Sequence, residues 1–302
     1  MRLQGQNLRI FTYNSVSEKY RVVAMASSCQ ATLTNNTEDE STKDDVDLSS
    51  RPRTASKGWS VQADALNILD APALLTAIKS REPMKLMFDE TSTDDNVTPE
   101  SASYSRSGLA YMNNVNLTFN DRETAAKTLQ WTGTGPLTHE TGVEVEDLTP
   151  GAYTKGQFVR LFLGTDNTTT PSKVIAAAKQ LTLHVSVSLE DATTKDTTGE
   201  WLVQEPVGLS YDISTSALVR GADEITSSVD GQGLSELEDI YEGGTPVKWQ
   251  IAKVSGANQR TKGDIIASGS AVLTQLQFTA QNRAAATYDA TLNGYGPYTV
   301  GA

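Results

Sequence analysis

The chain has 302 residues, which is enough for about two domains of ordinary size, each with its own core. Its 25 Lys and Arg against 37 Asp and Glu give a formal net charge of -12, which repels phosphate and argues against a protein that binds nucleic acid. The single cysteine, Cys29, excludes an internal disulfide framework and a multi-cysteine zinc site.

No apolar run approaches the roughly 18 residues of a membrane-spanning helix. The first residues also lack the apolar core that a signal peptide carries. We therefore expect a soluble protein that is made in a cytosol. Abundant Thr and Ser favour strands and loops over helices.

Two short strands are predicted at the start of each half of the chain. Residues 8–11 and 22–24 carry the apolar groups of such strands, and similar residues recur at 159–162 and 174–176. The recurrence is the first sign of an internal repeat, which decides the architecture wherever it occurs.

A longer predicted strand follows in each half, because apolar residues alternate with polar ones. These apolar residues are Cys29, Ala31 and Leu33 in the first half and Leu181, Leu183, Val185, Val187 and Leu189 in the second. Both strands lead into an acidic, hydroxyl-rich stretch, at 38–44 and 190–196, with the shared pattern Glu-Asp-x-x-Thr-Lys-Asp. This pattern lacks the glycine and the final glutamate of a calcium-binding loop, so we expect no metal there.

We interpret the two acidic stretches as contact loops between neighbouring domains or assembled copies, because both halves retain them although no site chemistry requires them. The candidate contact residues are Glu38, Asp39, Thr42, Lys43, Asp44, Glu190, Asp191, Thr194, Lys195 and Asp196. Residues 35–57 and 91–107 are too long for plain connections in a compact domain, which predicts functional or mobile loops.

One helix is predicted in each half, with its apolar side chains on one face to cover a sheet. The apolar residues are Leu74, Leu75 and Ile78 in the first helix and Leu234, Leu237 and Tyr241 in the second. The first helix begins at Asp70 with Pro72 in its opening turn. The second has the spacing of a capping box from Ser235 to Glu238 and ends at a pair of glycines.

The last hairpin of each half contains an irregularity, since the apolar period slips inside one strand. The apolar residues are Ala110 and Met112, then Val115, Leu117 and Phe119 in the first half, and Ala271 and Leu273, then Leu276 and Phe278 in the second. Such a slip requires a β-bulge or a change of sheet. Both halves then close on Gly-x-Gly-Pro, at 133–136 and 294–297.

Chance seldom places the same irregularity at the same point twice, so we interpret the chain as a tandem duplication. The predicted domains are residues 1–140 and 157–302, joined by a polar linker at 141–156. We expect residues 7–138 to superpose on residues 157–299. Each copy is predicted to be a β-rich domain with one flanking α-helix.

Catalytic candidates are few. The chain has two histidines: His139 lies near the linker, and His184 is predicted on a strand, pointing outward. Neither belongs to a nucleophile, base or metal constellation, and Cys29 is expected to pack in the core. We therefore predict no enzyme activity, no cofactor and no metal.

Each copy resembles the major tail tube protein of long-tailed bacteriophages. The resemblance in the first copy lies in residues 5–10, the acidic pattern, the strand Trp59-Ser60-Val61 and the closing segment 132–137. The second copy keeps the acidic pattern, the strand 208–211 and the Gly-x-Gly-Pro end, and departs elsewhere. The order of these motifs carries the resemblance, since none is diagnostic alone.

The resemblance implies a β-sandwich or barrel with a flanking helix, six of which form a ring, with rings stacked into the tube through which the genome leaves the virion. It implies the terminator, tape measure and distal tail proteins as partners, and DNA that passes through the lumen without specific binding. Two fused copies predict a homotrimer with pseudo-sixfold symmetry. Residues 139–156, extended, can span about 60 Å between adjacent ring positions.

The alternative is a surface adhesin or carbohydrate-binding protein made of tandem β-sandwiches. Threonine-rich strands, acidity and the lack of catalytic groups fit that class too. It predicts aromatic platforms in exposed loops and a monomeric chain, whereas a tube protein predicts few loop aromatics and self-assembly.

Overall fold

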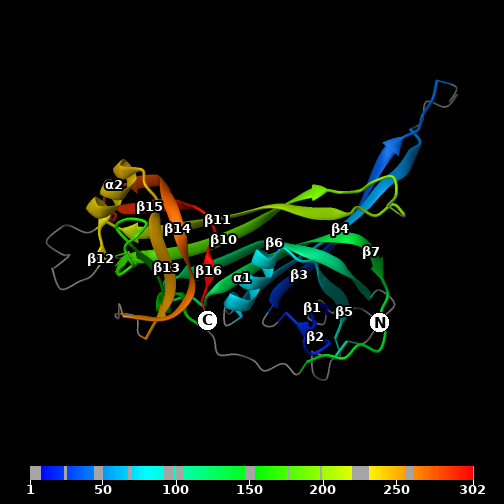
Figure 1. Ribbon diagram of the computed structural model, residues 1–302, viewed down its shortest axis with the longest axis horizontal. Coiled ribbons are helices and arrows are strands. Elements are labelled where there is room, and N and C mark those ends of the chain that lie inside the picture. Colours follow the sequence, from blue (N-terminus) through cyan, green and yellow to red (C-terminus); the bar gives the residue numbers. More distant parts are fainter. Residues whose placement is uncertain are drawn as a thin grey trace.

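The computed structural model describes residues 8–23, 26–43, 50–66, 70–91, 98–99, 105–146, 154–175, 177–197, 199–219, 231–255 and 261–301. In these residues the chain is mainly β, with two helices, which confirms the predicted fold class (Figure 1). The first half comprises β1 (Leu8–Asn14), β2 (Lys19–Val22), β3 (Ala26–Asp39), β4 (Pro52–Leu66), α1 (Ala71–Ser80), β5 (Met84–Glu90), β6 (Arg106–Asn120) and β7 (Ala126–Thr138). The second comprises β8 (Val159–Leu163), β9 (Lys173–Ile175), β10 (Ala178–Asp191), β11 (Gln204–Leu218), β12 (Gly231–Gln232), α2 (Leu234–Gly243), β13 (Val247–Val254), β14 (Lys262–Thr279), β15 (Thr287–Gly294) and β16 (Thr299–Val300).

The two halves have the same antiparallel strand pairings. In the first, β1 pairs with β2 and β5, β5 with β6, β6 with β7, β7 with β4, and β4 with β3. In the second, β8 pairs with β9 and β13, β13 with β14, β14 with β15, β15 with β11, and β11 with β10. Each strand of the first half therefore has a counterpart in the second, in the same chain order.

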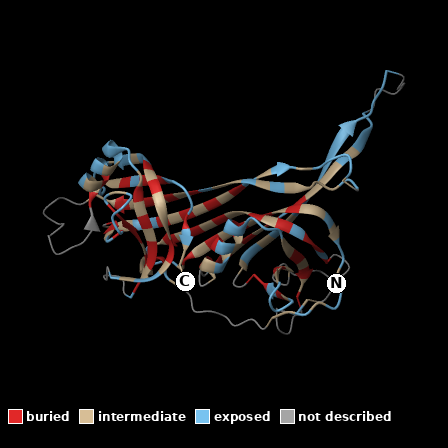
Figure 2. Cartoon of the chain, viewed as in Figure 1, coloured by how far each residue is buried: buried red, intermediate tan, exposed pale blue. Residues whose placement is uncertain are grey.

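One further pairing joins the halves. Strand β6 lies antiparallel to β10, from Gln180 opposite Asn120 to Ser186 opposite Asn114. A central sheet consequently runs through the molecule in the order β3-β4-β7-β6-β10-β11-β15-β14. Figure 2 shows buried residues along this sheet in both halves.

The predicted slip of the apolar period is confirmed as a register shift in both halves. The shift lies between Met112 and Asn114 where β6 pairs with β7, and between Leu273 and Gln275 where β14 pairs with β15. One extra residue on the bulged strand moves the following side chains to the other face. The apolar set after the shift therefore returns to the core.

Turn conformations also agree between the halves. Arg122 and Arg283, in the hairpin turns after β6 and β14, have φ of 63° and 64°. Gly135 and Gly296, in the Gly-x-Gly-Pro segments, have φ of 75° and 72°. This left-handed backbone favours glycine, which accounts for the second glycine of the motif.

The first glycine of the motif makes room for an aromatic ring. A Cβ at Gly133 would lie 2.0 Å from Cε2 of Trp59, and one at Gly294 would lie 2.6 Å from Cε1 of Tyr211. Trp59 on β4 and Tyr211 on β11 face these glycines from counterpart positions in the two halves. The motif thus has a packing role in each half.

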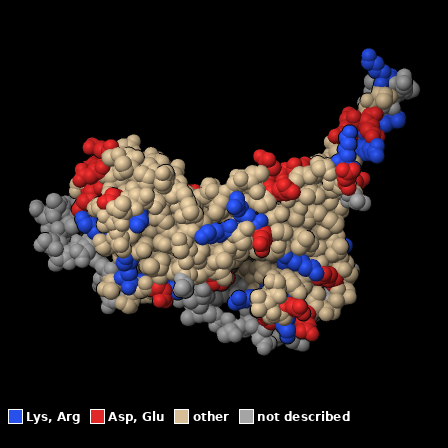
Figure 3. Space-filling model, viewed as in Figure 1, with Lys and Arg blue, Asp and Glu red and all other residues tan. Residues whose placement is uncertain are grey.

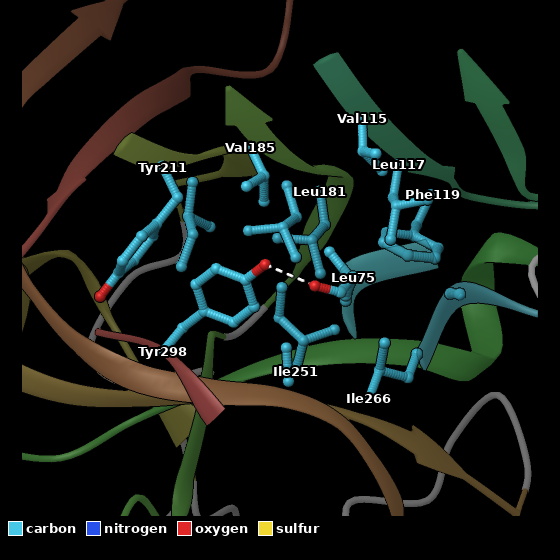
Figure 4. Close-up of a cluster of buried hydrophobic side chains, with 14 of the residues drawn as sticks. Leu75, Val115, Leu117, Phe119, Leu181, Val185, Tyr211, Ile251, Ile266 and Tyr298 are labelled. Atoms are coloured by element: carbon cyan, nitrogen blue, oxygen red, sulfur yellow. Dashed lines mark hydrogen bonds between the residues drawn. The ribbon is translucent and has the colours of Figure 1, made fainter. Parts of the chain in front are cut away.

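Helix α1 packs where the two halves meet. It contacts β6 of the first half and β10, β14 and β16 of the second. The Tyr298 hydroxyl donates to the Leu75 carbonyl at 2.7 Å (Figure 4). Lys79 Nζ donates to the Tyr298 carbonyl at 2.8 Å. Burial raises the pKa of Tyr298, so the hydroxyl keeps its proton and remains a donor.

The helix starts agree with the sequence in one case and correct it in the other. Helix α1 begins after Asp70, as predicted, although the Asp70 carboxylate accepts hydrogen bonds from the buried Lys127 at 2.5 and 2.6 Å instead of capping the helix. The capping box predicted for α2 was wrong. Helix α2 begins after Gly233, whose N–H donates to Glu236 Oε2 at 2.9 Å, because a glycine can stand at the cap position and shift the box two residues back.

The long loop expected at 35–57 is largely strand. Strands β3 and β4 continue to Asp39 and from Pro52 as a projecting hairpin, exposed on most of its surface (Figures 1 and 2). Both faces of this hairpin are polar, so the alternation that marks a strand ends at Leu33. In the other expected loop, Thr91 pairs with Pro99 and β6 begins at Arg106, while 92–97 and 100–104 lie outside the described residues.

The described parts of the predicted linker are attached to the first half. Val145 bridges to Tyr20. Just before the linker, the Glu140 carboxylate accepts hydrogen bonds from the Tyr20 hydroxyl at 2.6 Å and from Lys85. Farther on, Thr154 accepts a backbone hydrogen bond from Ala125 at 2.8 Å. Residues 147–153 lie outside the described residues, so the predicted domain boundaries remain a prediction.

Replacing Tyr298 with Phe should lower the free energy of unfolding by roughly 1–2 kcal/mol, because the Leu75 carbonyl loses its buried donor. Urea unfolding measures this change. The matched control is Tyr295→Phe, in the same segment but 56% exposed, which we expect to stay within about 0.5 kcal/mol of the unmodified protein. Equal effects of the two substitutions would contradict the role given to the contact.

Replacing Gly133 with Ala should cost roughly 1–3 kcal/mol of stability, because the Trp59 ring must move to admit the new Cβ. The control is Gly208→Ala, where the nearest atom would be Ser188 Cβ at an ordinary 3.9 Å. Thermal unfolding compares the two variants. A neutral Gly133→Ala would show that the ring does not depend on this glycine.

Candidate functional site

The face of the central sheet opposite the core is built mainly from amide and hydroxyl side chains, with three aspartates and one histidine among them. Residues that pair directly across strands share a face. The register places Tyr111, Ala126, Leu218 and Val272 on this face together with its polar members. The polar members are Gln30, Thr32 and Thr34 of β3; Ser60, Gln62 and Asp64 of β4; Thr128, Gln130 and Thr132 of β7; Asn114, Asn116, Thr118 and Asn120 of β6; Gln180, Thr182, His184 and Ser186 of β10; Ser210, Asp212, Ser214 and Ser216 of β11; Thr287, Asp289, Thr291 and Asn293 of β15; and Gln275, Gln277 and Thr279 of β14. We call this set the polar face.

Side chains of the polar face bind one another across strands. Asp64 Oδ1 accepts from Thr128 at 2.8 Å, and Gln130 donates to Gln62 at 3.3 Å. In the second half, the hydroxyls of Ser186 and Ser210 lie 2.9 Å apart. These contacts satisfy polar groups along the sheet and hold the side chains in place.

His184 lies on the polar face, where Nδ1 is 2.8 Å from Oδ1 of Asp212. Its other neighbours on the face are amides and hydroxyls. Three aspartates, Asp64, Asp212 and Asp289, are the carboxylates of this set, and the set contains no Lys or Arg. A surface of this kind offers a polyanion no lysine or arginine as an ion-pair partner.

The central sheet has two open edges, on β3 and on the second part of β14. In the described residues, β3 pairs with β4 alone, and residues 272–279 of β14 pair with β15 alone. Large apolar side chains lie at both edges: Leu33 is 65% exposed and Phe278 is 49% exposed. Open edges with apolar side chains are surfaces for pairing with another chain.

An apolar groove lies beside the β3 edge. It is lined by Ala31, Leu33, Trp59, Leu86, Phe88, Arg106 and Leu137 among others. The counterpart surface of the second half is filled, because α1 packs against it beside Tyr211, Ile251 and Tyr298 (Figure 4).

The acidic contact candidates of the first half lie on the projecting hairpin. Glu38 pairs with Arg53, and Asp39 Oδ1 accepts from the Ser41 backbone and hydroxyl, which lowers the Asp39 pKa. Thr42 and Lys43 are exposed, and Asp44 lies outside the described residues. Figure 3 shows charged side chains gathered on this hairpin.

The acidic candidates of the second half end the β10–β11 hairpin. Glu190 pairs with Glu205, and Asp191 Oδ1 accepts from the Thr193 backbone at 2.9 Å, where Thr193 likewise lowers the Asp191 pKa. The candidates Thr194, Lys195 and Asp196 are exposed in this turn. Asp39 and Asp191 therefore make the same local turn contact in the two halves.

This second hairpin docks on the first half through residues next to the acidic pattern. Lys57 of β4 binds Glu200 at 2.7 Å, which lowers the Glu200 pKa, and its backbone pairs with Trp201. The Leu202 carbonyl accepts from Gly135 N at 2.8 Å. The internal repeat does not point to residues 200–202, because the first half has no similar stretch.

The other residues considered for catalysis or metal binding, His139 and Cys29, lie in ordinary packing and hydrogen-bonding contacts. His139 Nδ1 lies 3.0 Å from the Ser105 carbonyl. Cys29 is half-buried at the edge strand, and burial raises its pKa. Within the described residues, no group of three or more His, Cys, Asp and Glu side chains is placed to hold a metal ion. Nor does that part of the chain contain a helix long and apolar enough to cross a membrane.

Comparison with known proteins gives one family. Residues 155–300 match the family model described as phage tail tube protein. The match lies in the half in which the motifs are less complete. No curated protein sequence matches the chain.

Solved structures with some likeness are also tail proteins. The tail of an empty gene transfer agent particle, refined helically with C6 symmetry, is 18% identical with a TM-score of 0.38, over 49% of this chain and 99% of that one. A chain from the native gene transfer agent virion is 16% identical, with a TM-score of 0.35 over 49% and 99%. The SPP1 tail tube protein is 15% identical, with a TM-score of 0.34 over 49% and 78%.

These structural likenesses are too weak to define the fold or the assembly of this chain. The family match carries the assignment, and it agrees with the ordered motifs and with the mainly β fold. It does not favour a surface adhesin. Residues 155–300, just under half of the chain, are therefore identified as phage tail tube sequence.

Proposed function

We propose that the protein polymerises as stacked rings whose lumen conducts the genome, with the polar face of the central sheet lining that lumen. The observation that best supports this proposal is the unbroken central sheet. Its polar face has no Lys or Arg among the residues named above, and its opposite face packs in the core. A closed ring of such sheets removes the open edges and presents DNA with amides, hydroxyls and a few carboxylates. DNA phosphate then passes without binding.

Three chains form each proposed ring. The matching pairings of the two halves support an origin by duplication, with domains at residues 1–140 and 157–302. Each chain brings eight strands to the central sheet, so three chains bring three times eight, or 24. Closed cyclic symmetry then gives a trimer with pseudo-sixfold character.

The proposed ring carries about 36 negative charges, three times the 12 of one chain. Other tail proteins, namely the terminator, tape measure and distal tail protein, are its proposed partners at the ends and inside of the tube. The protein is made in the host bacterial cytoplasm and assembles there into the virion tail. Genome passage requires no cofactor and no catalytic step.

Native mass spectrometry of assembled rings tests the stoichiometry. We expect a ring mass of three chains, each of 32.5 kDa. A six-chain ring would contradict the trimer and would leave the second half outside the lumen. A protein that stays monomeric at high concentration would contradict the tube proposal itself.

The acidic hairpin ends are proposed contacts between stacked rings or neighbouring domains. The double variant Glu38→Lys and Glu190→Lys reverses one charge on each hairpin and leaves the turn contacts of Asp39 and Asp191 intact. We expect rings of normal mass but shorter and fewer tubes in negative-stain images. The control with the same charge change is Glu18→Lys with Glu82→Lys, outside both hairpins, and equal tube growth in the two proteins would refute these contacts.

A further inference from the structure

The two strands that join the halves within one chain have counterpart strands that pair with nothing on the corresponding side in the described residues. Strand β6 of the first half corresponds to β14 of the second, and β10 corresponds to β3, because they occupy the same places in the two pairing patterns. Strands β6 and β10 pair with each other. Their counterparts β14 and β3 are the two open edges of the central sheet.

The apolar side chains on these four strands differ in burial between the paired and the open edges. Val115 and Leu117 on β6 and Leu183 on β10 are at most 1% exposed where these strands pair. At the open edges, Leu33 is 65% exposed and Phe278 is 49% exposed. Positions whose apolar side chains are buried where β6 pairs with β10 therefore have counterparts on β14 and β3 that are exposed to solvent.

The two helices also differ in what they contact. Helix α1 crosses the junction where β6 pairs with β10 and contacts β10, β14 and β16 of the other half. The counterparts of these elements are β3, β6 and the end of β7, which contribute Ala31, Leu33, Arg106 and Leu137 to the apolar groove. Helix α2 contacts β12 and β14 of its own half and leaves Tyr241 50% exposed.

We propose that the β3 edge and its apolar groove receive β14 and α2 of a second copy of this chain, in the register that β6 and β10 use within the chain. This contact specifies how the rings of the proposed function close, and it rests on that proposal. We assign the contact to a second copy because β14 and α2 of this chain correspond to β6 and α1, which already fit the counterpart surface inside the chain. They present apolar side chains that match the β3 edge and the groove.

The register follows residue by residue from the two pairing patterns. Positions on β6 map to β14 through Met112 with Leu273 and Asn114 with Gln275, opposite counterpart residues of β7 and β15. Positions on β10 map to β3 through Leu183 with Ala31, opposite Ile213 and Val61. The contact between copies therefore pairs Gln275 with Thr34, Leu276 with Leu33, Gln277 with Thr32, Phe278 with Ala31, Thr279 with Gln30, Ala280 with Cys29 and Gln281 with Ser28.

Tyr241 of α2 corresponds to the buried Ile78 of α1, since both helices end three residues later at a left-handed residue. Tyr241 accordingly enters the apolar groove of the next copy. The polar face continues across the contact, because Gln275, Gln277 and Thr279 come opposite Thr34, Thr32 and Gln30. No charged residue is placed in the paired segment.

The native Cys29 provides the test of the register. In the variant Ala280→Cys, the new thiol lies directly opposite Cys29 of the next copy, at a strand-pair spacing that a disulfide can bridge. We expect mild oxidation of assembled full-length protein to give covalent dimers and trimers on a non-reducing gel. The matched control Thr279→Cys has the same number of thiols, but its side chain is one position away and on the polar face.

Cross-linking of Ala280→Cys with little in Thr279→Cys supports the contact. Equal cross-linking of both variants, or none in Ala280→Cys while rings form, overturns the register and leaves the tube proposal standing. The absence of rings in the unmodified protein overturns both proposals.

A second measurement does not depend on disulfide chemistry. Leu33→Asp puts a carboxylate into the proposed contact, so we expect a folded monomer by circular dichroism and by native mass. Val16→Asp is the control, since Val16 is an apolar side chain that is 92% exposed in the β1–β2 turn, and rings should persist. Rings of Leu33→Asp as stable as those of Val16→Asp would overturn the inference.

Discussion

Backbone pairing between β6 and β10 is the interaction on which the rest of the architecture depends. An antiparallel sheet of four strands from either half would have two open edges, each with unpaired backbone groups and apolar side chains. Pairing β6 with β10 satisfies one edge from each half and buries Val115, Leu117 and Leu183 behind it. Helix α1 closes this junction from the core side through the Leu75 carbonyl and Tyr298. In the proposed ring, the remaining two edges pair with other copies.

In the proposed tube, the sheet face away from the core would let an acidic protein line a conduit for DNA. Its charge is not spread evenly: Figure 3 shows acidic groups on α2 and on the projecting hairpin, while the polar face contains three aspartates and one histidine among amides and hydroxyls. Cross-strand contacts such as Thr128 with Asp64 hold these side chains against the sheet. In the proposed lumen, a lining without Lys or Arg would give DNA phosphate no ion pair with these side chains to form or break during passage.

Much of this architecture could be predicted from the sequence, and the failures have physical causes. Apolar periodicity located the core strands and the bulge after Met112, because burial on one face imposes alternation. It failed beyond Leu33, where both faces of the β3–β4 hairpin are polar and backbone pairing alone makes the strand. The helix cap at Gly233 was missed because glycine carries no capping side chain, and the docking of Trp201 on Lys57 because nothing similar recurs in the first half.

The polar face could not be predicted from the sequence for a different reason: alternation shows which residues of one strand share a face, and only the register between strands shows that they form one surface across both halves. A cryo-electron microscopy reconstruction of the assembled tube tests the central claim most directly. It should show three chains per ring, with β14 of one chain antiparallel to β3 of the next, Phe278 opposite Ala31, and the polar face toward the lumen. A ring in which β3 and β14 remain unpaired, or in which the second half lies outside the lumen wall, would contradict it.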